Sequence, residues 1–402
     1  MYIRTLSLRQ FRTYQRLELD LPAAPVLLLG ANAQGKTSLL EAVAYLALGH
    51  SPLTSAEQHL IHWQAVKADM PYAHLAADVV HRARSVHIEI AVERKELSNG
   101  SARLEKRIRV DQHGVRRAGL AGQLNVVMFM PQDVELVGGP PAERRRHLDD
   151  VLSQIYPEYV DALATYHSAL SRRNALLRHL HERGGDARQL SPLEERLAQT
   201  GVSIALYRQR AIGQLSMLAD RLHQELTGGQ AWLRFVYQPN FDTLRPPDLD
   251  YQMGLLSETT RETPVDVESL RQAYLGLFQR YRRQELARGA TLVGPHRDEL
   301  RFLSNEIDLG IYGSRGQQRS AVLALRLAEL RWLERITGES PVLLLDEVLA
   351  ELDQARRRYL LELLTGMQQT ILATTNAEMF PDDFRKRTCM LSVSDGIISP
   401  IT

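Results

Sequence analysis

Apolar positions recur with a period of two near both ends of the chain and with helical spacing along its middle. Leu17, Leu19 and Leu21 alternate with acidic residues, and residues 86–92 alternate in the same way, which predicts half-buried strands. Fully buried strands are predicted at four short apolar runs, which cover residues 26–29, 126–130, 341–347 and 369–375.

The stretch from about residue 140 to residue 289 is mostly helical by pattern. Ser191, Pro192 and Glu194 resemble a capping box with proline at the first helical position, and they open a long amphipathic run that ends at Gly228. A second long helix is predicted over residues 266–288. Heptads are not sustained, so we expect a helical subdomain and not a long coiled coil.

Composition narrows the class of protein only a little. At 402 residues the chain is long enough for two compact units, and a net charge of +1 confines any nucleic-acid surface to local patches. With the single cysteine Cys389 no internal disulfide is possible, which favours a reducing cytosol. The N-terminus has no signal-peptide core and no run is long enough for a membrane span, so we expect a cytoplasmic protein without membrane contact.

A glycine-rich loop between a predicted strand and a predicted helix indicates a phosphate-binding site. It fits the pattern G-x-x-x-x-G-K-[ST], whose backbone N–H groups surround phosphate oxygens at the positive end of the helix. Lys36 is expected to reach the β- and γ-phosphates of ATP, and Thr37 to ligate Mg²⁺. The loop residues are Gly30, Ala31, Asn32, Ala33, Gln34, Gly35, Lys36 and Thr37.

A second apolar strand ends in Asp346 and Glu347, which suits the other half of an ATP site. Asp346 is expected to hold Mg²⁺, and Glu347 to orient and deprotonate the attacking water. The two motifs lie far apart in the sequence, so the helical stretch must be inserted between halves of one core. We therefore expect an α/β fold: an ABC-ATPase-like P-loop head with mixed β-sheets from residues 1–138 and 290–402, and a mainly helical lobe from residues 139–289.

The turn Ser314-Arg315-Gly316-Gln317 precedes a long amphipathic helix predicted from Ser320 to about Arg335. Its hydroxyl and backbone N–H groups suit a γ-phosphate contact, and in ATPases of the ABC type the equivalent turn serves the neighbouring subunit. The plain alternative is an N-capped helix. By the same likeness Asp353 is expected to meet its twin across a dimer, and Gln132 to sense Mg²⁺ and the γ-phosphate.

With these motifs the chain resembles the RecF family, bacterial DNA-repair ATPases related to SMC heads. The resemblance covers about two thirds of the chain, at both ends. It rests on Phe11-Arg12-Thr13-Tyr14 and on the stretches 30–37, 294–300, 312–319 and 344–347. It implies a nucleotide contact for Arg12, ATP-dependent homodimerisation on DNA, and help in loading RecA at gaps, with RecR and RecO as further partners. No physical role follows for His296 or Arg297.

Two departures from related ATPases bear on chemistry. RecF relatives often have Asp-Asp where this chain has Asp346-Glu347, and Glu is the commoner base in ABC-type sites. ABC transporters carry a histidine after the last core strand, whereas Thr374, Thr375 and Asn376 stand here, as is usual for the RecF family. We therefore expect slow, DNA-stimulated ATP hydrolysis.

Residues 81–120 contain ten Arg or Lys but five acids, so a basic β-rich surface is expected to contact DNA phosphates. The alternative is an ordinary solvated strand face. The residues assigned to DNA are Arg103, Lys106, Arg107 and Arg109.

Three other functions remain open at the level of sequence. One is an ATPase that drives a membrane transporter. Another is an SMC-like structural head for which ATP is a shape switch. The third is a P-loop kinase, in which the turn at Ser314 has no purpose.

Overall fold

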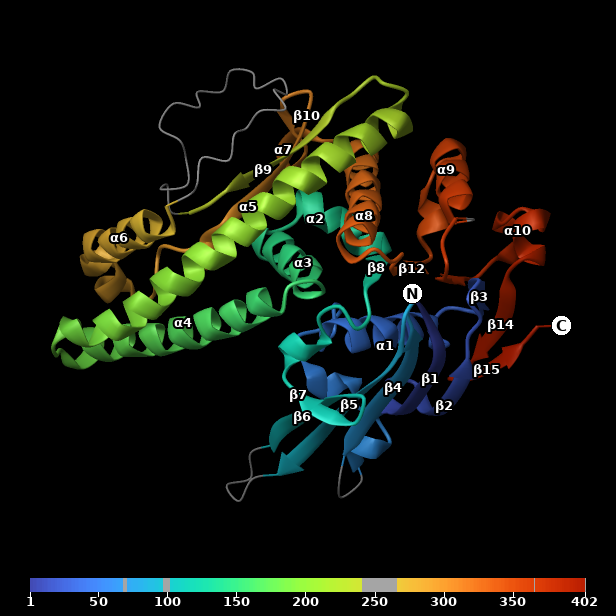
Figure 1. Cartoon of the computed structure of the whole chain (residues 1–402), viewed down its shortest axis with the longest axis horizontal. Helices are drawn as coiled ribbons and strands as arrows, with labels where there is room; N and C mark the ends of the chain where they lie inside the picture. Colours follow the sequence, from blue (N-terminus) through green and yellow to red (C-terminus); the bar gives the residue numbers. More distant parts are fainter. Residues whose placement is uncertain (68–70, 97–101, 241–265, 365, 402) are drawn as a thin grey trace.

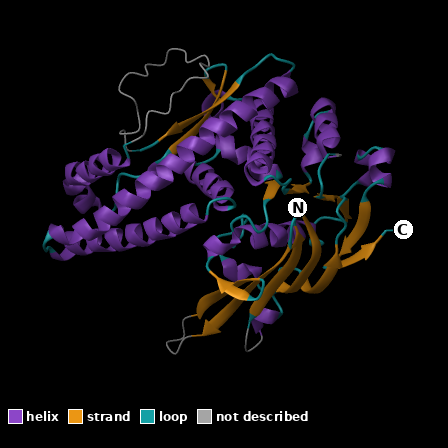
Figure 2. Ribbon diagram, viewed as in Figure 1, coloured by secondary structure: helices purple, strands orange, loops and turns teal. Residues whose placement is uncertain are grey.

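The computed structural model describes the chain except for residues 68–70, 97–101, 241–265, 365 and 402. Within these described residues, two six-stranded sheets and a three-stranded sheet are combined with helices, and the long helices of the middle of the chain project to one side (Figure 1, Figure 2). This mixed architecture confirms the predicted α/β class. Among the helices that the structure describes, none has both the length and the apolar character needed to traverse a bilayer.

The first sheet is antiparallel, with the order β2-β1-β4-β5-β6-β7. The predicted alternation is confirmed, because Leu17 and Leu21 are buried while the acidic residues between them are exposed, and every second residue from Val86 to Val92 is buried. The strands are β1 (Tyr2–Phe11), β2 (Tyr14–Asp20), β4 (Tyr72–Val80), β5 (Ser85–Glu96), β6 (Ala102–Val110) and β7 (His113–Val115).

The second sheet has the order β15-β14-β3-β13-β12-β8 and is parallel apart from its edge strand β15. All four apolar runs predicted from the sequence lie in it. Consecutive residues face different cores: Val342 and Leu344 pack on one side, Leu343 and Leu345 on the other. The strands are β3 (Pro25–Leu29), β8 (Val126–Phe129), β12 (Val342–Asp346), β13 (Thr370–Thr374), β14 (Cys389–Ser394) and β15 (Ile397–Pro400).

Helix α1 (Lys36–Leu48) contacts both six-stranded sheets and is buried along almost its whole length. Gly49 ends it in the left-handed conformation, at φ 71°. Because α1 starts at the phosphate loop, its rigid burial fixes that loop relative to both sheets.

The opposite face of the parallel sheet is covered by α8 (Arg315–Thr337), against which α5 (Ser191–Thr227) packs. Other α-helices are α2 (Glu135–Gly138), α3 (Pro141–Ser153), α4 (Pro157–Arg183), α6 (Val267–Arg288), α7 (Leu309–Tyr312), α9 (Gln354–Leu364) and α10 (Asp382–Lys386). Short 3-10 turns are η1 (Glu57–Leu60), η2 (Ala65–Lys67), η3 (Arg117–Leu120), η4 (Pro131–Val134), η5 (Ala187–Leu190), η7 (Pro295–Arg297), η8 (Val348–Glu351) and η9 (Ala377–Met379).

The capping box predicted at the start of α5 is wrong. The helix is capped by Leu190 without a side-chain hydrogen bond, and Ser191 is already helical. The Glu194 carboxylate instead turns inward and accepts hydrogen bonds from Arg173 and Arg282, at 2.8 and 2.6 Å. Leaving a buried carboxylate without hydrogen-bond partners would cost more free energy than leaving the start of the helix without a side-chain cap.

The middle of the chain also contains a strand that the helical pattern conceals, β9 (Leu233–Gln238). It pairs antiparallel with β10 (Glu299–Ser304), which pairs with β11 (Ile307–Asp308). The predicted lobe of residues 139–289 therefore shares a sheet with residues that we assigned to the head. The domain boundaries themselves stay a prediction.

Candidate nucleotide-binding site

The glycine-rich loop lies between β3 and α1, as the sequence predicts. Gly35 caps α1 at φ 113°, a left-handed conformation that side chains other than glycine rarely adopt. A Cβ atom on Gly30 would lie 2.2 Å from the Val393 carbonyl oxygen, so glycine is required there by close approach. Ala31, Asn32 and Ala33 form the exposed tip of the loop.

Two neighbours that the sequence analysis missed brace this loop. The Tyr14 hydroxyl donates to the Gly35 carbonyl at 2.9 Å. The turn between β14 and β15 holds Gln34 twice: Asp395 N donates to its side-chain oxygen at 2.7 Å, and Gly396 N to its carbonyl at 3.2 Å. The signals available in the sequence were the Asp-Gly turn between two strands and the position of Tyr14 beside Arg12.

The structure brings the two predicted halves of the site together. The Thr37 hydroxyl donates to the Asp346 carboxylate at 2.7 Å, and Lys36 Nζ lies 3.4 Å from the Glu347 carboxylate. Lys36 is buried and also donates to the carbonyls of Gly30 and Ala31, at 2.6 and 3.0 Å. Strand β13 lies between β3 and β12, so the sheet order itself places both motifs at one edge.

The carboxylates at this edge are poorly compensated by the protein. Burial raises the pKa of Asp346 and the neighbouring Glu347 raises it further, against the opposing effects of Thr37 and Lys36. Asp346 Oδ1 is buried and has no hydrogen-bond partner among the described residues, and Glu347 Oε1 has only the ion pair with Lys36 at 3.4 Å. Oxygen ligands of this kind fit a divalent cation such as Mg²⁺. Glu347 is also held at φ 53°, a strained conformation of the sort found at functional sites.

Arg12 is placed beside α1 by a carboxylate. Its Nε and one terminal nitrogen donate to Glu41 at 2.8 and 2.7 Å, and Glu41 is buried. The other terminal nitrogen donates to the His59 carbonyl at 3.1 Å. A nucleotide contact for Arg12 stays a prediction.

Gln132 lies exposed in η4 and lines a cavity of about 380 Å³. Its side chain donates to the Met130 sulfur at 3.3 Å. The adjacent Asp133 is buried and accepts two hydrogen bonds from Arg326 of α8, at 2.9 and 2.8 Å. The segment that carries Gln132 is thus fixed to the helix that starts at Ser314. Whether Gln132 meets Mg²⁺ stays a prediction.

The turn at Ser314 is exposed, and α8 begins at Arg315, five residues earlier than we predicted from the sequence. Ser314 and Gln317 form the capping box: Gln317 N donates to the Ser314 hydroxyl at 3.3 Å, and Ser314 N to the Gln317 side chain at 2.9 Å. Gly316 is exposed beside them. The N-capped helix considered as the plain alternative is therefore present. The capping box does not prevent this exposed turn from contacting a second subunit, and that contact stays a prediction.

Asp353 lies exposed just before α9, where its carboxylate accepts a hydrogen bond from Arg356 N at 2.9 Å and also pairs with the Arg356 side chain. The hydrogen bond to Arg356 N satisfies one of the backbone N–H groups at the start of α9. Its contact with a twin across a dimer stays a prediction.

The structure separates the four residues assigned to DNA. Arg103, Arg107 and Arg109 are exposed on one face of β6, whereas Lys106 points to the other face. There Lys106 donates to the Glu57 carboxylate at 2.5 Å and to the Gly49 carbonyl at 2.7 Å. On the exposed face Arg107 lies 3.1 Å from Glu93, and Arg109 lies 3.7 Å from Glu89. The excess of positive charge counted in the sequence is therefore largely balanced on this face.

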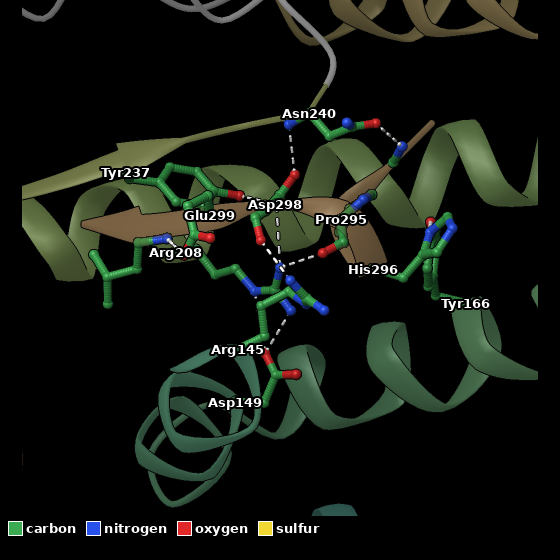
Figure 3. Close-up of polar contacts among 12 residues, drawn as sticks. Arg145, Asp149, Tyr166, Arg208, Tyr237, Asn240, Pro295, His296, Asp298 and Glu299 are labelled. Atoms are coloured by element: carbon green, nitrogen blue, oxygen red, sulfur yellow. Dashed lines mark hydrogen bonds and ion pairs between the residues drawn. The ribbon is translucent and has the colours of Figure 1, made fainter. Parts of the chain in front are cut away.

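The stretch 294–300, within which no role for His296 or Arg297 followed from the sequence, forms a joint between α5, β9 and α3 (Figure 3). Asp298 is buried and accepts hydrogen bonds from Arg208 of α5 at 3.1 Å, from the Tyr237 hydroxyl of β9, and from Asn240 N at 2.8 Å. Arg208 also donates a hydrogen bond to the Asp149 carboxylate of α3, at 2.8 Å. This network links α5, β9 and α3.

The sheets, the braced loop and the acidic strand end define an ABC-type P-loop head. A family model described as RecF/RecN/SMC N terminal domain matches residues 2–398. Proteins named DNA replication and repair protein RecF are similar over nearly the whole chain. The relative from Chloroflexus aurantiacus is 44% identical over 98% of this chain and 99% of its own length. The one from Herpetosiphon aurantiacus is 42% identical over 100% of both.

Solved structures agree with these relatives. One of "the recombination mediator protein RecF-ATP in RecFOR pathway" covers 100% of this chain and 98% of its own, with 28% identity and a TM-score of 0.81. An SMC head bound to the C-winged helix domain of ScpA, at 15% identity and a TM-score of 0.51, is similar in fold alone and covers 100% and 97%. The chain belongs to the RecF family, which confirms the resemblance noted in the sequence.

Proposed function

We propose that this protein binds ATP and Mg²⁺ at the phosphate loop, closes with a second copy around the nucleotides, and acts on DNA in recombinational repair and replication. The observation that supports this most directly is the Thr37–Asp346 hydrogen bond, which unites two motifs 309 residues apart. The RecF structure solved with ATP is that of a relative 28% identical to this chain, and the RecF name of other relatives supports the repair role. Neither a transporter nor a kinase is favoured by this family.

Each residue of the nucleotide site has a separate role in binding or hydrolysis. Binding of a phosphate would exchange the carbonyl contacts of Lys36 for phosphate oxygens. Thr37 and Asp346 would hold Mg²⁺, which screens the charge of the phosphates when it is bound. Glu347 is the base, because its carboxylate directly follows Asp346 at the end of β12 and lies 3.4 Å from Lys36 Nζ, beside the phosphate loop.

The exposed turn at Ser314 supports assembly of the site from two copies. Ile311 and Tyr312, just before the turn, expose 64% and 75% of their surface, which favours a contact with another protein surface. Each charge-assisted contact from Ser314 or Gly316 to a γ-phosphate is worth about 1.5–3 kcal/mol. Twofold symmetry doubles the number of contacts. A shift of about 5.5 kcal/mol already inverts a 1:99 equilibrium, so ATP can switch monomer to dimer.

DNA is the expected polymer partner, and RecR, RecO and RecA are the expected protein partners, in keeping with the RecFOR pathway named for the solved relative. Slow turnover is expected, because Thr374, Thr375 and Asn376 replace the histidine of faster ABC-type sites. An SMC-like head with negligible hydrolysis is the competing function.

The test is ATP hydrolysis with and without gapped DNA by the wild type, Glu347→Gln and Lys36→Ala. We expect slow hydrolysis by the wild type that DNA stimulates, nucleotide binding with a loss of turnover of about a hundredfold or more in Glu347→Gln, and weak binding in Lys36→Ala. Equal rates for Glu347→Gln and the wild type would contradict Glu347 as the base. Negligible wild-type turnover even with DNA would favour the shape switch.

A further inference from the structure

A cavity of about 740 Å³ lies between α3, α4, α5 and the turn η3, with Pro295 and His296 on its wall. Among the described residues, none of the phosphate loop lines it. It is therefore a separate site from the one at Lys36. Tyr166, which accompanies His296 in Figure 3, also lines it.

The lining of this cavity is strongly cationic. Of the residues that the structure describes, seven arginines but only three aspartates line it. Two of those aspartates are already engaged: Asp149 pairs with Arg208 at 2.8 Å, and Asp150 pairs with His50 at 2.8 Å. These partners, and Arg117 at 3.9 Å from Asp150, line the cavity themselves, but three carboxylates cannot neutralise seven arginines, so an excess of positive charge remains.

Three of the arginines have their donors free. Arg116, Arg172 and Arg196 are exposed, and no side-chain partner exists for them among the described residues. They come from three different elements, the segment before η3, α4 and α5, so they do not form a stripe along a single helix. Arg208, in contrast, already donates hydrogen bonds to the Pro295 carbonyl, Asp298 and Asp149.

Two arginines of the cavity, Arg145 and Arg117, are partly buried and lie near other cationic side chains. Burial lowers the pKa of Arg145, and the nearby Arg208 lowers it further. Burial likewise lowers the pKa of Arg117, although the neighbouring carboxylates of Asp150, Asp149 and Glu57 raise it. Charged groups that repel one another in a partly buried space are stabilised when an anion enters.

We propose that this cavity binds phosphate groups, as a second anion site apart from the phosphate loop. Guanidinium groups pair with phosphate through parallel hydrogen bonds, and a wall of them recognises phosphate better than isolated surface lysines. The phosphates come either from a free polyphosphate or from a DNA backbone. The cavity suits phosphate better than the outer face of β6, where Arg107 and Arg109 lie beside carboxylates.

The test compares two double variants with the same loss of charge. Arg172→Ala with Arg196→Ala removes free donors from the cavity, one on α4 and one on α5. Arg183→Ala with Arg221→Ala is the matched control, because these exposed arginines of the same helices lie outside the cavity lining and have no partner among the described residues. Thermal unfolding of both variants checks that each remains folded.

Two probes distinguish the sources of phosphate. Tripolyphosphate is titrated calorimetrically in a Lys36→Ala background, which removes binding at the phosphate loop. A fluorescent DNA duplex is titrated by anisotropy over a range of salt concentrations. We expect the cavity variant to lose about tenfold or more in affinity for at least one probe while the control loses less than about twofold. If DNA is the source, its salt slope should also fall by about two.

A loss for tripolyphosphate alone supports a free polyphosphate as the occupant, and a loss for DNA supports the backbone. Equal affinities of cavity and control variants for both probes would overturn the proposal. ATP binding at Lys36 is measured separately and should be unchanged in both double variants. Failure of this inference would thus leave the nucleotide site untouched.

Discussion

Gly294 occupies a position that no other residue fits. Its φ is 127°, and a Cβ atom there would lie 1.9 Å from the Tyr274 hydroxyl and 2.4 Å from the Tyr166 hydroxyl. We expect Gly294→Ala to lower the free energy of unfolding by about 2 kcal/mol or more, because both the strain and the overlap must be relieved. Urea unfolding measures this loss.

Gly213 gives the matched control, since it lies inside α5 with nothing within 4 Å of an added Cβ. Gly213→Ala should raise the free energy of unfolding by about 0.5–1 kcal/mol. Similar effects of the two substitutions would show that Gly294 is not sterically confined.

His296 makes stability depend on pH. Burial lowers its pKa to about 4, so the native state holds a neutral imidazole that hydrogen-bonds Tyr166 at 2.7 Å. The unfolded chain takes up a proton below its ordinary pKa of about 6.5, so stability should fall as the pH drops from about 6.5 towards 4. Over that window the wild type should lose about 2–3 kcal/mol more than His296→Gln, which has no imidazole to protonate. Urea titrations at several pH values measure the difference, and parallel pH profiles would refute the assignment.

At the scale of elements, the joint at Asp298 connects α5, β9 and α3. Asp298→Asn keeps the shape of the side chain but removes the charge opposite the buried Arg208, and should cost about 3 kcal/mol of unfolding free energy. Asp382→Asn is the control, because Asp382 pairs with Arg385 while its side chain is 75% exposed. That exposed pair should be worth less than about 1 kcal/mol. Chemical denaturation compares the two, and equal small losses would mean that the joint is not rigid.

Most elements and both nucleotide motifs could be predicted from the sequence, because their signals are local. Continuous apolar runs identified β3, β8, β12 and β13, and the glycine pattern located the phosphate loop. Strand β9 and the bracing of Gln34 by Asp395 were missed, since each depends on a partner remote in the chain. Lys106 was grouped with Arg107 because composition counts charge without knowing which face of a strand bears it.

At the scale of the whole molecule, the account depends on ATP joining two copies of the chain. The Asp133–Arg326 pair fixes the segment of Gln132 to the helix that begins at Ser314. Both regions assigned to the γ-phosphate are thereby parts of one packed unit, so a change at one is expected to move the other.

The most direct test is the molar mass in solution by light scattering, with ATP, with ADP and without nucleotide. We expect Glu347→Gln with ATP to have twice the mass of one chain, and the mass of one chain without ATP. The double variant Ser314→Arg with Glu347→Gln should bind ATP yet keep the mass of one chain, because the arginine blocks the exposed turn. A single-chain mass for Glu347→Gln saturated with ATP, or a dimer that persists with Ser314→Arg, would contradict the central claim.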